Sequence, residues 1–134
     1  MEPIKVIVRF MDGKVMKGYA NDFNPIRPSF HFNENVGSAL SQPILIEIKD
    51  LKAIFFVRTF EGNSEYAERN NFMQGDLIQG RKAEVTFPDG EVIRGSTMGY
   101  DAQRLGFFLV PVDPKSNNIR IFVVTKAVKN FRFL

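Results

Sequence analysis

The sequence has no cysteine, no tryptophan and a single histidine among its 134 residues. A chain without cysteine can form neither a disulfide framework nor a thiolate metal site, and it suits a reducing compartment. Zinc sites need three or four ligands, mostly cysteine and histidine. We therefore expect His31 to have a structural or surface role, and we expect no bound metal.

Excess charge and long apolar runs are also scarce. The chain has 18 basic and 15 acidic side chains, a net charge of +3, and no run of Lys or Arg. This balance permits nucleic-acid binding without indicating it. No apolar run approaches the roughly 20 residues of a membrane span, and the first strand is expected to begin almost at Met1, which leaves no room for a signal peptide. We expect a soluble, cytoplasmic protein that does not bind membranes.

What the chain does contain is an internal repeat. A single constant shift aligns 5–57 with 82–134 without a gap. An ungapped match over a whole unit indicates a duplication. Identical pairs include Val8/Val85, Phe10/Phe87, Asp12/Asp89, Gly13/Gly90, Gly18/Gly95, Arg27/Arg104 and Phe30/Phe107. Units of roughly 60 residues bury little surface alone, so two such units are expected to pack together.

Each unit begins with the pattern of a β-hairpin. Residues 5–10 alternate, with Val6 and Val8 on one face, as in a half-buried strand. Asp12 and Gly13 then make the turn, because glycine adopts a positive φ without a steric cost. A glycine inside the returning strand, Gly18 in the first copy, predicts a bulge or a sharp bend.

The rest of each unit predicts three more strands, and the last two are joined by one tight helical turn. The expected organisation is a first barrel at 1–57, a connector at 58–81 with a short helix at 65–70, and a second barrel at 82–134. The predicted loop between the third and fourth strands covers 33–43 in the first unit. The fold class is therefore all-β, with two tandem five-stranded barrels joined by a short helical connector.

These residues resemble the first motif of the Sm-like proteins, whose fold is a five-stranded SH3-type barrel. The motif consists of alternating apolar residues, Asp-Gly, a glycine, and then an aromatic residue followed by Asn or Asp. Its first copy is Val6, Val8, Phe10, Asp12, Gly13, Gly18, Phe23 and Asn24, and its second is Val85, Phe87, Asp89, Gly90, Gly95, Tyr100 and Asp101. The chain also resembles uncharacterised bacterial proteins that contain two such barrels.

The resemblance implies RNA binding, but the family's nucleotide-binding positions differ here. Where Sm proteins that bind RNA have an asparagine, this chain has Arg27 and Arg104. The Arg-Gly that follows the fourth strand in that family is missing after Ile48 and after Thr125. The uridine pocket is therefore not expected in the family's form, while nucleic acid stays an alternative partner.

Arg27 and Arg104 are retained in matching turns, next to Asn24 and Asp101. One interpretation is a cation that holds an anion or a carboxylate of a partner. The other is that each arginine bonds turn carbonyls or its neighbouring side chain. No group of residues suggests catalysis, because the Asp-Gly turns account for the repeated aspartates. We expect no enzyme and no cofactor.

Strand parity predicts a contact surface. Neighbouring residues of a strand point to opposite faces, so Phe55 and Phe108 are expected to face away from their own barrels. Phe122 joins them because residues 121–124 are apolar on both faces, as in a strand that is covered on both sides. Exposed phenylalanines favour a contact between the barrels, or between chains in a homo-oligomer. Together these observations predict a non-enzymatic binding or adaptor protein that engages a protein or peptide partner. Nucleic acid and a small anionic ligand or nucleotide are the alternatives.

Overall fold

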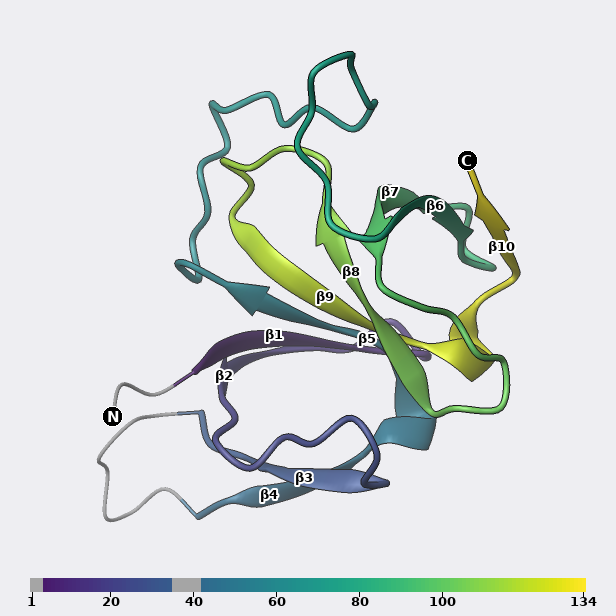
Figure 1. The fold of residues 1–134 in the computed structure, drawn as a ribbon. Coiled ribbons are helices and arrows are strands. Elements are labelled where there is room, and N and C mark those ends of the chain that lie inside the picture. The colour runs from purple at the N-terminus through teal and green to yellow at the C-terminus, as the bar shows by residue number, and fades with distance from the viewer. Residues whose placement is uncertain (1–3, 35–41) are drawn as a thin grey trace.

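The computed structural model describes residues 4–34 and 42–134, and this part of the chain is all-β (Figure 1). It contains strands and two short 3-10 turns, and none of its helices is long and apolar enough to cross a membrane. The strands are β1 (Lys5–Phe10), β2 (Val15–Tyr19), β3 (Ser29–Phe32), β4 (Ile44–Glu47), β5 (Leu51–Val57), β6 (Arg81–Thr86), β7 (Val92–Thr97), β8 (Gly106–Pro111), β9 (Asn118–Val124) and β10 (Asn130–Phe133). The turns η1 (Ile48–Asp50) and η2 (Thr125–Ala127) precede β5 and β10. Most of the predicted loop at 33–43 lies outside the described residues.

The strands of the two halves pair in the same order and register. Within the first half, Val8 lies opposite Ile54. In the second half, Val85 lies opposite Phe131, which is the same pair in the alignment of 5–57 with 82–134. The bridge between Tyr19 and Asn33, which connects β2 to the end of β3, corresponds in the same way to the pair of Ser96 and Val110. Both halves therefore use the order fifth, first, second, third and fourth strand.

The two halves do not form separate closed barrels. Eight strands join in one sheet in the order β10-β6-β7-β8-β9-β5-β1-β2, and β3 and β4 form a second, two-stranded sheet. The sheets stay open because the fifth strand of the first half, β5, pairs with the fourth strand of the second half, β9. Figure 1 shows these two strands side by side in the centre of the molecule.

The central strands are apolar on both faces, and this explains the shared sheet. Ile54 of β5 and Phe122 of β9 lie opposite each other and face the core of the first half. Phe55 and Ile121 also lie opposite each other, but they face the core of the second half. Each of these cores therefore contains side chains from both halves, and each of these two strands has apolar neighbours on both sides.

The connector does not form the expected helix at 65–70, so this prediction is wrong. The structure has a turn at 64–65, a bend at Tyr66 and no regular secondary structure at 67–70. Asn63 accepts a hydrogen bond from the backbone N–H of Glu65, an Asx-type turn that competes with helix formation. The residues that follow hydrogen-bond to the second half of the molecule, through Glu68 to Ser116 and through Asn71 to Arg94. Tertiary contacts thus replace the local hydrogen bonds of a helix.

Glycine has two different roles in the hairpins. In the turns, Gly13 and Gly90 have φ of 95° and 94°, the left-handed region that glycine adopts at low cost. Gly18 and Gly95 have no positive φ, and β1 pairs with β2 without a bulge at Gly18. A Cβ atom at Gly18 would lie 2.3 Å from the carbonyl oxygen of Asn33, so glycine is needed there for the close approach of two backbones.

Candidate binding groove

A groove of about 570 Å³ lies where the second half meets a turn of the first half. Its walls combine aromatic and aliphatic side chains with a few polar groups at the rim. The volume falls within the range of about 300–1,000 Å³ that is typical of ligand sites. The lining residues are Pro25, Gln79, Ser96, Thr97, Met98, Gly99, Tyr100, Asp101, Arg104, Gly106, Phe107, Phe108, Val110 and Phe122.

The groove brings together four of the seven residues that sequence reasoning selected, namely Asp101, Arg104, Phe108 and Phe122. Phe55 lies elsewhere, 7% exposed in the core of the second half. Asn24 and Arg27 belong to the neighbouring turn of the first half, which contributes Pro25 to the lining.

The turn at Asp101 is built by its own side chain. The Asp101 carboxylate accepts a hydrogen bond from the backbone N–H of Gln103 at 2.9 Å, and its carbonyl accepts one from the N–H of Arg104 at 3.1 Å. Asn24 makes the same two contacts in the first half. Asn and Asp favour such turns because the side chain imitates a backbone acceptor. Turn formation therefore explains why both halves have Asn or Asp at this position, Asn24 in the first and Asp101 in the second.

The arginine at the rim of the groove is loosely held. Arg104 Nε lies 3.8 Å from Asp101 Oδ2, and the two side chains are 75% and 55% exposed. An exposed ion pair of this length contributes little to stability. Both groups can therefore exchange this contact for hydrogen bonds to a bound molecule.

The chain matches, over residues 2–134, the model of a family of unknown function, DUF6982. It belongs to this family. Comparisons with curated proteins and with solved structures found no match. The DUF6982 match covers both halves and the connector, so it includes all residues that line the groove.

An aromatic cluster forms the inner wall of the groove in this DUF6982 protein. Phe122 contacts Phe23 edge-to-face at a centroid distance of 4.9 Å, and it contacts Phe108 in the same way at 5.2 Å. Arg120, which sequence reasoning missed, places its guanidinium 4.4 Å from the centre of the Phe108 ring and 4.6 Å from that of Phe56. Partial burial lowers the pKa of Arg120. In the sequence, the signal that could have pointed to Arg120 is its place between two apolar residues of β9, Ile119 and Ile121.

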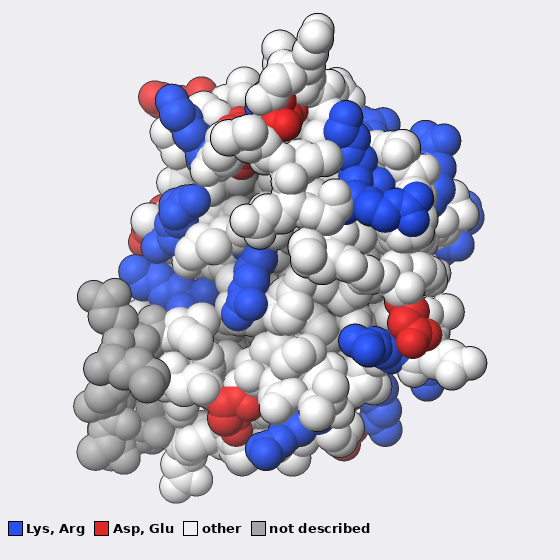
Figure 2. Space-filling model, in the orientation of Figure 1, with Lys and Arg blue, Asp and Glu red and all other residues white. Residues whose placement is uncertain are grey.

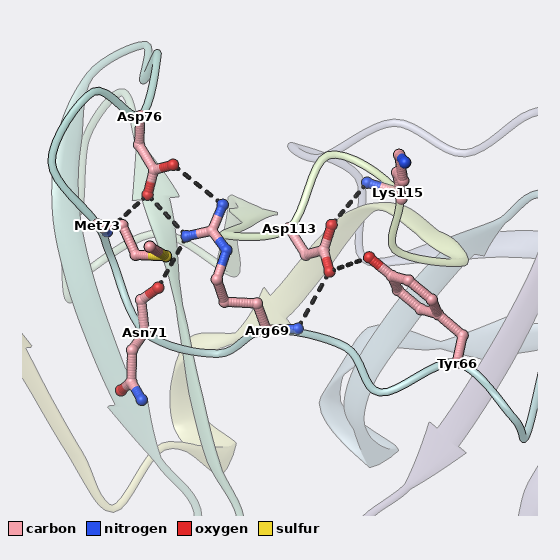
Figure 3. Close-up of polar contacts among 7 residues, drawn as sticks. All are labelled: Tyr66, Arg69, Asn71, Met73, Asp76, Asp113 and Lys115. Atoms are coloured by element: carbon pink, nitrogen blue, oxygen red, sulfur yellow. Dashed lines mark hydrogen bonds and ion pairs between the residues drawn. The ribbon is translucent and has the colours of Figure 1, made fainter.

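The DUF6982 connector is fastened to the second half around Asp113 (Figure 3). The Tyr66 hydroxyl and the backbone N–H of Arg69 both donate to Asp113 Oδ2, and the N–H of Lys115 donates to Oδ1. These hydrogen bonds lower the pKa of Asp113 to about 2, and the hydrogen bond from Tyr66 has the largest effect. Arg69 also bonds both carboxylate oxygens of Asp76, at 2.8 and 3.0 Å. This network holds the chain that leads to Gln79 and the groove.

Further ion pairs connect strands and halves. Hydrogen bonds from Arg132 and from Arg94, each at 2.8 Å, hold the pKa of Glu84 below its usual value. Lys52 of β5 reaches Asp89 and Glu91 in the second hairpin. Burial alone would lower the pKa of Lys52, but the hydrogen bonds to these two carboxylates raise it.

His31, the single histidine, hydrogen-bonds to a neighbouring carboxylate, that of Asp22. Its Nδ1 lies 2.7 Å from Asp22 Oδ2, and both side chains are largely exposed. Burial alone would raise the pKa of Asp22, but its hydrogen bonds with His31 lower it. Among the described residues, no group of three or more His, Cys, Asp or Glu side chains could hold a metal ion. The geometry around His31 is that of a hydrogen bond at the surface.

Proposed function

We propose that this protein is a non-enzymatic binding module that holds a protein or peptide partner in the groove between its halves. The observation that carries the proposal is the combination of aromatic walls with an exposed, exchangeable pair, Asp101 and Arg104, at the rim. Apolar walls provide affinity for a partner's side chain, while a small number of polar groups fix its orientation. A compartment that keeps thiols reduced, such as the cytoplasm, suits a chain without cysteine.

Exposed apolar side chains mark the same region. Met98 is 83% exposed and Val110 is 48% exposed, and both line the groove. Contiguous exposed apolar surface with a polar rim is typical of interaction sites. A peptide with one large apolar side chain for the groove and a charged neighbour for Arg104 or Asp101 would cover this surface.

We also propose that the two halves are copies of one Sm-like unit. The support is their common register, because the pair of Phe30 with Ile46 corresponds to the pair of Phe107 with Val123 when the two halves are aligned. A shared fold does not fix a function. The binding role therefore rests on the groove.

The groove can be closed by one substitution and tested directly. A Cβ atom at Gly99 would meet no heavy atom within 4 Å, so Gly99→Leu should fill the groove without disturbing the fold. Random peptides displayed on phage would be selected on the wild-type protein and then measured on variants. Selected peptides should bind Gly99→Leu at least tenfold more weakly, with an unchanged thermal midpoint of unfolding.

Arg27 provides the matched control for Arg104, because it occupies the equivalent turn without lining the groove. Arg104→Ala should weaken the selected peptides several-fold, and Arg27→Ala should leave their affinity unchanged. Peptides that bind Gly99→Leu as tightly as the wild type, or that respond equally to both arginine variants, would contradict the proposal.

Nucleic acid is the second candidate, and a different surface favours it. Lys and Arg side chains gather over the region of β6 and β10, at the upper right of Figure 2. There the Arg81 guanidinium lies 3.7 Å from the centre of the Phe133 ring, and Phe133 is 38% exposed. Cations beside an exposed aromatic ring suit single-stranded nucleic acid. Binding of an oligonucleotide that does not weaken between low and moderate salt would exclude this candidate.

A further inference from the structure

The edge of β4 is a second surface, separate from the groove. β4 is the strand of the first half that corresponds to β9 in the second half. β9 pairs along one edge with β8 and along the other with β5, where Phe55 lies opposite Ile121. Within the described residues, β4 pairs with β3 and has no strand on its other edge. The same strand is thus covered in one half and open in the other.

The exposure of equivalent residues shows what is uncovered. Ile121 is 2% exposed and Phe122 is fully buried, but their counterparts Ile44 and Leu45 are 43% and 56% exposed. Ile46 is 3% exposed, so one part of β4 is anchored in the core of the first half. The remainder of the strand presents apolar side chains beside an unpaired edge, an arrangement that favours pairing with another chain.

We propose that the free edge of β4 binds an extended segment of another protein, which adds as an antiparallel strand. Strand addition gains backbone hydrogen bonds, and pockets for alternate side chains provide specificity. The pairing of β5 with β9 supplies the register when β9 is replaced by its counterpart β4. The partner then places a small residue opposite Ile46, a β-branched residue opposite Leu45 and an aromatic residue opposite Ile44. These are the places that Ala53, Ile54 and Phe55 occupy on β9.

A second copy of this chain fits the edge less well than a different polypeptide. The strand of the second half that corresponds to β5 is β10, and Arg132 stands in it at the place of Phe55. Arg132 Nε donates to Glu84 Oε1 at 2.8 Å. Docking β10 on β4 would take the Arg132 side chain, which is 60% exposed, out of water beside Ile44, and desolvating a charged side chain is costly.

The probe is a fluorescent peptide with the sequence of residues 50–58, Asp-Leu-Lys-Ala-Ile-Phe-Phe-Val-Arg, whose charged residues keep it soluble. Binding is measured by fluorescence anisotropy. Ile44→Lys and Leu45→Lys should each weaken binding at least tenfold. Val15→Lys is the matched control, because Val15 is 42% exposed on another strand, and it should change the affinity less than twofold.

The register is tested by cross-linking, which the absence of cysteine makes specific. Leu45→Cys should form a disulfide with a peptide that has cysteine at the place of Ile54. It should react much less with a peptide that has cysteine at the place of Phe55, because that side chain would point to the opposite face. Equal cross-linking of the two peptides would overturn the proposed pairing.

Other outcomes are equally decisive. No binding of the peptide to the wild-type protein, or an equal loss with Val15→Lys, would overturn the proposal. Should light scattering show a dimer that Leu45→Lys dissociates, a second copy would be the occupant and the proposal would be wrong.

If a β4 variant does not fold, the same contact can be tested on the wild-type protein. A peptide with lysine at the place of Phe55 should then bind at least tenfold more weakly than the original peptide. Gly99→Leu should leave this binding unchanged, so the edge and the groove can fail independently.

Discussion

The two halves have the same strand register, yet their outer faces differ in chemistry. On the first half, Ile7 of β1 lies opposite Phe55 of β5 and both contact the core of the second half. On the second half, the equivalent pair is Glu84 of β6 and Arg132 of β10, joined by a hydrogen bond. The unit fold fixes which residues point outward. What covers the outer face decides whether those residues are apolar or charged.

The comparison extends to the fourth strands, where the identical residues Ile44 and Ile121 have different surroundings. Ile121 of β9 is covered by β5, whereas β4, which contains Ile44, has only β3 beside it in the described structure. A buried position in one half is thus a surface position in the other. This difference separates a residue that stabilises the fold from one that is available to a partner.

The largest expected effect tests that pair of isoleucines. Ile121→Ala should lower the free energy of unfolding by about 2–5 kcal/mol, since it removes a buried side chain and leaves a cavity. Ile44→Ala should cost less than about 1 kcal/mol, because nearly half of this side chain is in water, 43% against 2% for Ile121. Urea unfolding of the two variants measures both values.

Equal losses for Ile44→Ala and Ile121→Ala would break the comparison. That result would mean that β4 is covered in solution, either by other residues of the chain or by a second molecule. Repeating the measurement at two protein concentrations separates these explanations, because only the second depends on concentration.

A smaller effect is expected where the halves agree. A Cβ atom at Gly18 or Gly95 would lie 2.3 Å from a backbone carbonyl oxygen, of Asn33 and Val110 respectively. Gly18→Ala and Gly95→Ala should therefore each destabilise by roughly 1–3 kcal/mol through overpacking. Gly99→Ala is the control, because its Cβ would have no neighbour within 4 Å. If all three variants unfold at the same denaturant concentration, close backbone approach is not the reason for these glycines.

The sequence is informative about the strands because their signals are local. Alternation of Val6 and Val8 predicted the first strand, and the Asp-Gly turn predicted its hairpin, as the structure has it in β1 and β2. The all-β class followed from the same pattern in both copies. The apolar character of both faces of β9 was also visible, in Ile121 and Phe122.

The parts that could not be predicted depend on contacts between distant residues. Closed barrels and paired β5 and β9 strands satisfy the same local pattern, so the pattern alone cannot choose between them. The connector was assigned a helix from its local composition, but Asp113, which binds Tyr66 and the backbone of Arg69, lies beyond three further strands of the chain. The groove combines Pro25 of one half with Arg104 of the other, and no local signal joins these two residues.

The smallest expected effect concerns the connector, which bonds chiefly to the second half and so adds to the difference between the halves. The Asp113 carboxyl has a pKa of about 2, below its ordinary value of 3.8, because Tyr66 and two backbone N–H groups bond the carboxylate. A depressed pKa means that the folded state favours the charged form. The stabilisation is complete above about pH 4 and is lost as the pH falls toward 2.

Asp113→Asn should remove this part of the acid dependence, so the urea midpoint of the variant should fall less than that of the wild type between pH 4 and pH 2. Tyr66→Phe removes the first of the hydrogen bonds and should raise the pKa of Asp113 toward 3.8 without deleting the carboxylate. Carboxyl chemical shifts measured by NMR across this range give the pKa directly. An Asp113 that titrates near 3.8 in the wild type would show that the connector is not fastened there. The connector would then not be held on the second half by Asp113, and this difference between the halves would disappear.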